Sequence, residues 1–294
     1  MCTKCARLLK AKNMSTNQLK TIHAVHFNDC KNYTTKQLRE NFLLDGLEKD
    51  NAIELAYTHY DRMVTGVVKP IMDIVALPTY VNLKSDYFLE RRELGIINVG
   101  GDGTVVADGI NYVLSKYDCL YVGRGVKSVT FQSGDANQPA IFFLTSAPAH
   151  QTYPTTFLKS TDAAPLELGA KETCNERQLI KYIHNDGIQS CQLVMGVTKI
   201  KNGSVWNSVP PHTHDRRSEI YFYFDVAADQ RVFHLMGEPQ ETRHLVVANN
   251  EAIVSPSWGI HCGCGTGNYS FIWAMAGENK EFTDMDPAPI STLL

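Results

Sequence analysis

Short hydrophobic runs separated by turn-forming residues dominate the chain after about residue 90. The runs are rich in Val, Ile, Tyr and Phe, and Gly, Asn or Asp stands between most of them. In the first half they lie at 95–99, 104–107, 110–114, 119–122, 128–132 and 140–144. The pattern returns at 192–198, 219–224, 231–236, 244–247, 252–254 and 270–275. Many short strands at this spacing predict an antiparallel sandwich or barrel.

Two local patterns add detail to this mainly β prediction. Asp108-Gly109, between two hydrophobic runs, is typical of a tight hairpin turn. Thr34 and Gln37 have the spacing of a capping box, and Leu38 and Phe42 follow on one helical face. We therefore expect one helix near the N-terminus and strands after it.

The candidate functional residues lie at polar positions between the predicted C-terminal strands. His212 and His214 are two residues apart, so they point to the same face of a strand. Glu219 is out of phase with this pair, and the polar run 215–217 offers a turn or bulge that resets the register. His261 follows a proline turn at 256–260. Three imidazoles and one carboxylate complete a ligand set for zinc, iron, nickel or manganese, whereas surface histidines beside a turn are the simpler interpretation.

The segment 148–172 interrupts the strand pattern and predicts a domain boundary. It is rich in Pro, Thr, Ala and polar residues and has little periodicity. We place an N-terminal barrel at 1–155 and a C-terminal, metal-binding barrel at 156–294.

The two predicted barrels resemble each other in sequence. Residues 90–92 repeat the acidic-Arg-Arg pattern of residues 215–217, and residues 118–125 align with residues 251–258. On this register the N-terminal copy carries Tyr87, Leu89 and Ser128 where the C-terminal copy carries His212, His214 and His261. The pattern favours a duplicated barrel whose first copy lacks metal ligands, although chance similarity between β-rich halves is the alternative.

Composition and charge narrow the classes of function. The chain has 294 residues, of which 44% are hydrophobic, and its formal net charge is −3. This charge gives no reason to expect nucleic acid or an anionic membrane as a partner. No apolar run reaches the roughly 20 residues that span a bilayer, and 1–13 lacks the apolar core of a signal peptide. We expect a soluble, cytoplasmic protein whose eight scattered cysteines are free thiols.

The ordered set of histidines and glutamate is the pattern of the cupin superfamily. Gly203 and Gly259 are displaced from their usual places in that pattern, which weakens a generic assignment. Longer strings are more specific, and from about Asn41 onward the chain resembles the 5-keto-4-deoxyuronate isomerase family. The strings that carry this resemblance are 87–95, 147–150, 221–224, 237–244 and 255–258.

This resemblance implies a fold, a cofactor and an activity. The expected subunit is mainly β, with two cupin-type (jelly-roll) β-barrels and a few short helices, and six subunits form a homo-hexamer. The family's ligands carry over to His212, His214, Glu219 and His261, which would hold one Zn²⁺ per subunit. The implied reaction converts the small-molecule uronate 4-deoxy-L-threo-5-hexosulose uronate to 3-deoxy-D-glycero-2,5-hexodiulosonate in pectin degradation.

The implied isomerisation moves a proton between neighbouring carbons and passes through an enediolate. A Lewis-acid metal can hold both oxygens, although a purely structural zinc is the alternative. The substrate carboxylate calls for an arginine, and Arg243 is the first candidate, ahead of Arg217. Glu241 is a candidate proton shuttle or, equally, an exposed acid paired with Arg243. Tyr221 shares a face with Glu219 and either lines the cavity or packs in the core.

Two other classes of function fit the bare pattern. A cupin dioxygenase uses a similar ligand set to hold Fe(II), and it would consume oxygen. A non-catalytic, sugar-binding protein with two barrels is the other alternative, but the complete C-terminal ligand set argues against it.

Overall fold

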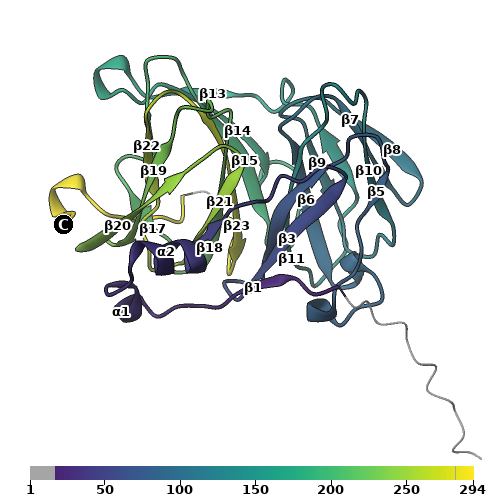
Figure 1. The fold of residues 1–294 in the computed structure, drawn as a ribbon, viewed down its shortest axis with the longest axis horizontal. Helices are drawn as coiled ribbons and strands as arrows, with labels where there is room; N and C mark the ends of the chain where they lie inside the picture. Colours follow the sequence, from purple (N-terminus) through teal and green to yellow (C-terminus); the bar gives the residue numbers. More distant parts are fainter. Residues whose placement is uncertain (1–16, 282) are drawn as a thin grey trace, which may run out of the picture.

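The computed structural model describes residues 17–281 and 283–294, and most of its regular structure is β-strand (Figure 1). Each half of the chain contributes a seven-stranded and a four-stranded sheet. This arrangement confirms the mainly β fold with few short helices. Cys2 and Cys5 lie outside the described residues, and the six cysteines within them are free.

In the N-terminal half the two sheets are built almost wholly from antiparallel pairs. The larger sheet has the order β1 (Lys20–Ile22), β3 (Ala52–Thr58), β4 (Val64–Lys69), β11 (Phe142–Pro148), β6 (Arg92–Asn98), β9 (Cys119–Val122) and β12 (Thr156–Leu158). The smaller sheet has the order β5 (Val75–Ala76), β10 (Val129–Ser133), β7 (Gly103–Ala107) and β8 (Ile110–Leu114). Asp108 and Gly109 join β7 to β8 with φ of 44° and 83°, which confirms the predicted hairpin turn.

The C-terminal half repeats this order of strands. Its larger sheet runs β13 (Leu166–Leu168), β14 (Arg177–Ile183), β15 (Val194–Ile200), β23 (Ser270–Gly277), β18 (Arg217–Phe224), β21 (Glu251–Ser255) and β2 (Leu43–Leu44). Its smaller sheet runs β16 (Trp206–Asn207), β22 (Cys262–Gly265), β19 (Val232–Glu238) and β20 (Glu241–Val247). A further pair joins β17 (His212–Thr213) to β24 (Asp286–Pro287). The matching topology of the halves is what a duplicated barrel predicts.

The short helices lie outside the sheets. They are α1 (Phe27–Cys30), α2 (Thr35–Phe42), η1 (Val81–Leu83), η2 (Phe88–Glu90), η3 (Lys171–Thr173) and η4 (Ile290–Thr292). Helix α2 has the predicted capping box between Thr34 and Gln37, and it buries Leu38 and Phe42. Among the described residues, no helix has both the length and the hydropathy needed to cross a membrane.

Two strands pair across the domain boundary that was predicted at residue 155. Strand β2 lies early in the sequence but pairs with β21 in the C-terminal sheet, and α2 lies beside that sheet in Figure 1. Strand β12 lies after residue 155 but pairs with β9 in the N-terminal sheet. Each half therefore receives its last sheet strand from outside its predicted range.

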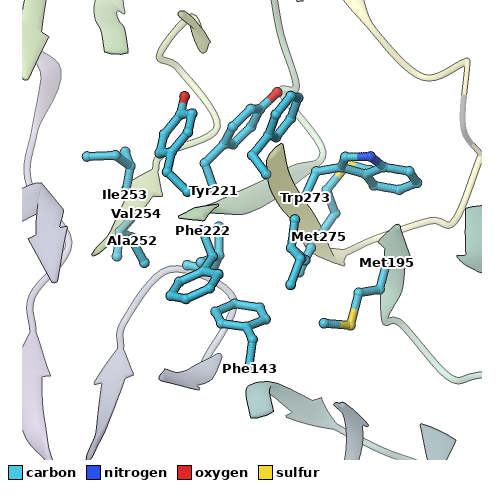
Figure 2. Close-up of a cluster of buried hydrophobic side chains, with 14 of the residues drawn as sticks. Phe143, Met195, Tyr221, Phe222, Ala252, Ile253, Val254, Trp273 and Met275 are labelled. Atoms are coloured by element: carbon cyan, nitrogen blue, oxygen red, sulfur yellow. The ribbon is translucent and has the colours of Figure 1, made fainter. Parts of the chain in front are cut away.

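The two large sheets pack face to face and share one hydrophobic core. Alternate residues of β18 point to opposite sides, so Phe222 contacts the N-terminal half whereas Tyr221 points into its own barrel (Figure 2). The rings of Phe143 and Phe222 stack with their centroids 4.6 Å apart. One side of β18 thus joins the halves, and the other side lines the interior of the C-terminal barrel.

Candidate metal centre and cavity

Two turns bring the expected metal ligands together in the C-terminal barrel. His212 lies in β17, and a turn at Asp215 and Arg216 separates His214 from β18, which confirms the predicted reset of register. Glu219 is therefore on the inward face of β18. His261 lies between the turn that follows β21 and the start of β22.

The side chains of these four residues converge. The Nε2 atom of His212 is 3.2 Å from that of His214 and 3.0 Å from that of His261. The Oε2 atom of Glu219 lies 3.0 Å from Nε2 of His261 and 3.4 Å from Nε2 of His214. Four donors about 2.1 Å from one zinc ion in a tetrahedron are themselves about 3.4 Å apart. The three histidines could therefore hold a metal ion. The Glu219 carboxylate lies within 3.4 Å of two of them.

Burial keeps two of these histidines neutral. Desolvation, with smaller contributions from His214 and Arg217, lowers the pKa of His212 to about 3. Burial also lowers the pKa of His261 well below its usual value. A neutral imidazole has a free lone pair on one ring nitrogen, which is the form that binds a metal. The site is thus electrostatically suited to a cation rather than to protonated histidines.

A chain segment near the C-terminus fixes the orientation of His214. The Nδ1 atom of His214 is 2.6 Å from the carbonyl oxygen of Asp284, to which it donates if Nε2 is the metal-binding nitrogen. Arg217 donates to the same carbonyl oxygen at 3.1 Å and to that of Glu281 at 2.7 Å. Arg217 is 1% exposed, so its guanidinium is committed to holding this segment beside the histidines.

Charged contacts attach the same segment to the turn between β17 and β18. Arg216 forms ion pairs with Asp284 and Asp286, and its hydrogen bonds hold the pKa of the Asp284 carboxyl well below its usual range. Strand β24 pairs with β17, so backbone hydrogen bonds reinforce these contacts.

A cavity of about 330 Å³ opens beside the four donors. This volume lies at the lower end of the range typical of small-molecule sites, roughly 300–1,000 Å³. Its polar lining residues are Arg177, Thr198, Ser208, His212, His214, Arg217, Glu219 and Tyr221. Its apolar lining residues are Leu168, Leu179, Val209, Pro210, Phe271, Trp273, Met275 and Met285. The wall thus combines an apolar surface with a few convergent polar groups.

The two tyrosines of β18 have different environments. Tyr221 lines the cavity, its hydroxyl lies 3.0 Å from Oγ of Ser208, and its ring packs against that of His261. Burial raises the pKa of Tyr221 well above 10, so its hydroxyl stays protonated near neutral pH. Tyr223 lies deeper, and its hydroxyl contacts Nδ1 of the buried His234 at 2.7 Å. Tyr221 therefore belongs to the cavity, whereas Tyr223 belongs to the core.

The structure does not bring Glu241 and Arg243 to the other candidate residues. Both lie in β20, the edge strand of the smaller sheet, and neither lines the cavity. Their side chains form an ion pair at 2.8 Å, and Arg243 also donates to the carbonyl oxygen of Lys31. This geometry matches the alternative of an exposed acid paired with its neighbouring arginine.

Sequence reasoning did not identify Arg177 and Ser208 as cavity residues. Arg177 begins β14, more than thirty residues before His212, and no motif marks it. Ser208 lies in the loop that precedes β17, where it lines the cavity and contacts the hydroxyl of Tyr221.

The fold and the convergent donors define a cupin-type β protein with a group able to bind a metal. The chain also matches the model of the KduI/IolB family over residues 49–289, and it belongs to this family. Relatives with high identity are named 4-deoxy-L-threo-5-hexosulose-uronate ketol-isomerase. The relative from Shouchella clausii is 53% identical over 90% of this chain and 96% of its own length. That from Lachnoclostridium phytofermentans is 51% identical over the same shares.

Solved structures with low identity share the fold. An IolB-like protein from Salmonella typhimurium superposes with a TM-score of 0.64 at 15% identity, over 82% of this chain and 94% of the other. The oxalate decarboxylase OxdC of Bacillus subtilis gives a TM-score of 0.53 at 9% identity, over 76% of this chain and 71% of the other. Both support a cupin-type β fold.

Proposed function

We propose that this protein is a metal-dependent ketol-isomerase that converts 4-deoxy-L-threo-5-hexosulose uronate to 3-deoxy-D-glycero-2,5-hexodiulosonate. The observation that carries the proposal is the convergence of four donors, three of which (His212, His214 and Glu219) line a cavity of about 330 Å³. The support from the comparisons is the name shared by relatives that are about half identical over nearly the whole chain.

We further propose that His212, His214, Glu219 and His261 are the metal ligands and that the ion is Zn²⁺, one per subunit. Nitrogen and carboxylate donors at these separations suit zinc, which accepts three protein ligands with an open position or four in a closed site. An ion held there would act as a Lewis acid on neighbouring substrate oxygens and stabilise the charge of the enediolate.

The residues around the donors supply binding and orientation. Tyr221 presents a neutral hydroxyl to the cavity, where it can donate to a substrate oxygen while Ser208 fixes its direction. Phe271, Trp273 and Met275 form an apolar wall that limits the access of water to the reacting carbons. Glu219 is the only carboxylate among the described residues that line the cavity, and the candidate proton shuttle Glu241 does not line it.

The location and assembly proposed here rest on the family resemblance. We propose that the protein acts in the cytoplasm on a small-molecule uronate, as a homo-hexamer, without a nucleic-acid or membrane partner. Light scattering coupled to size-exclusion chromatography tests the assembly, because a hexamer of this chain has six times the 32.9 kDa mass of the subunit.

The decisive test of the reaction is an assay on freshly generated substrate. Proton NMR should show the aldehyde-derived signals replaced by those of the 2,5-diketo product, with oxygen consumption at the background level. An absence of turnover in metal-loaded protein would contradict the isomerase, and stoichiometric oxygen uptake would favour the dioxygenase instead. Binding of the uronate without conversion would favour the sugar-binding alternative.

A further inference from the structure

A hexuronate has two ends that a binding site must distinguish. If the reacting carbons lie at the four donors, as the proposed function requires, the carboxylate at the other end lies elsewhere in the cavity. A carboxylate withdrawn from water needs a cationic partner or several hydrogen-bond donors. The cationic side chains among the described lining residues are Arg177 and Arg217.

Arg217 is committed through both of its terminal nitrogens. They donate to the carbonyl oxygens of Glu281 and Asp284, and the side chain is almost fully buried, with its Nε left without a hydrogen-bond partner. Turning it toward a ligand would release the segment that orients His214. Arg217 is therefore a positioning residue of the donor cluster.

Arg177, in contrast, has few polar contacts within the protein. It is half-buried at the start of β14, and its one hydrogen bond runs from Nη1 to the carbonyl oxygen of Asn175 at 2.9 Å. Among the described residues it forms no ion pair. Arg177 lines the same cavity as Leu179 and Thr198, so the guanidinium donors not used by Asn175 are available to a bound anion.

Tyr221 connects Arg177 to the donor cluster. Burial is the main cause that lowers the pKa of Arg177, and the nearby Tyr221 opposes this effect. The ring of Tyr221 in turn packs against His261, with the ring centroids 5.4 Å apart. Arg177, Tyr221, His212 and His214 therefore line one cavity.

We propose that Arg177 binds the carboxylate of the uronate and thereby determines both the specificity for acidic sugars and the direction in which the substrate enters. The planar guanidinium can bind a carboxylate by donating two parallel hydrogen bonds to its oxygens, which neither lysine nor glutamine reproduces. With the carboxylate held at β14, the other end of the six-carbon chain extends past Tyr221 toward His212 and His214.

Steady-state kinetics test this role in Arg177→Gln and Arg177→Lys. We expect KM for the uronate to rise about 10- to 100-fold in Arg177→Gln, the range for a lost charge-assisted hydrogen bond. The value of kcat should change much less, the metal content should be unchanged, and Arg177→Lys should recover part of the loss. Arg231→Gln, an exposed arginine of the same half, is the matched control and should behave as wild type.

Calorimetric binding separates this proposal from the reaction itself. We expect metal-loaded wild type to bind galacturonate at least about tenfold more tightly than galactose, and Arg177→Gln to bind both alike. This discrimination would support the role of Arg177 even if the wild type failed to isomerise the uronate. A wild type that binds acid and neutral sugar equally, or an Arg177→Gln variant that still prefers the acid, would overturn it. A loss of preference in Arg243→Gln alone would overturn it in favour of the β20 arginine.

Discussion

The carbonyl oxygen of Asp284 is shared by a proposed metal ligand and by a buried arginine. It accepts hydrogen bonds from Nδ1 of His214 and from Arg217, so the arginine fixes the acceptor that sets the orientation of the imidazole. Such outer contacts select the ring nitrogen that faces the metal and raise its basicity. The metal affinity of the site should therefore depend on a residue that is not itself a ligand.

Arg217→Lys tests this dependence. Lysine keeps the charge but cannot reach both the Glu281 and Asp284 carbonyls, so zinc affinity should fall about 10- to 100-fold. Competition with a chromophoric chelator measures the change, and Arg231→Gln provides the control. Unchanged zinc affinity in a folded Arg217→Lys protein would contradict the proposed role of Arg217 in orienting His214.

At this scale the sequence indicated the four donors but not their surroundings. His212, His214 and Glu219 are close in the chain, so strand alternation and one turn were enough to bring them to one side. Asp284 reaches His214, and Arg177 reaches the cavity, from distant segments of the chain. Arg243 is the opposite case, because this candidate from a family string lies on an edge strand and does not line the cavity.

A buried glutamate connects elements of the two halves. Glu93 of β6 is 0% exposed and accepts hydrogen bonds from the backbone amides of Cys191, Gln192 and Leu193, which lead into β15. It also accepts one from the hydroxyl of Tyr121. Four donors solvate a carboxylate that has no ion-pair partner among the described residues, and they hold the loop before β15 against β6.

Glu93→Gln should weaken this connection. Replacing one carboxylate oxygen with an amide NH₂ places a donor against backbone N–H groups, so unfolding free energy should fall by about 2–4 kcal/mol. Urea denaturation measures the change. Glu54→Gln, which removes only a surface ion pair with Lys49, should cost less than about 1 kcal/mol. Equal, small effects in both variants would contradict the structural role of Glu93.

Elements specified by local chemistry were predictable, whereas the exchange of edge strands was not. The capping box at Thr34 and the turn at Asp108-Gly109 act within a few residues, so the sequence alone indicated α2 and the β7–β8 hairpin. Strands β2 and β12 are only two and three residues long. The packing of the two halves determines which strands β2 and β12 pair with, and no local sequence pattern predicts that packing.

At the scale of the whole molecule, the shared core should make the halves unfold together. Phe143 lies in the N-terminal sheet and stacks on Phe222 of the C-terminal sheet (Figure 2). Exchange of β2 and β12 adds further contacts between the halves. The packing therefore predicts one cooperative transition rather than two.

Phe143→Ala tests this cooperativity. Loss of the buried ring should lower the unfolding free energy by about 3–5 kcal/mol. All three tryptophans, Trp206, Trp258 and Trp273, lie in the C-terminal half, so their fluorescence reports on that half alone. The fluorescence and circular-dichroism midpoints should shift equally. An unshifted fluorescence transition would show that the halves unfold independently, and exposed Ile110→Ala serves as the control.

The most direct test of the central claim measures zinc content and isomerase rate on the same samples. The samples are protein as isolated, protein stripped by a chelator, stripped protein reloaded with zinc, and His212→Ala. The rate should follow the zinc content, falling at least about 100-fold on stripping, returning on reloading, and staying low in a folded His212→Ala protein. Full turnover by folded, zinc-free protein would contradict the account and confine any metal at these four residues to a structural role.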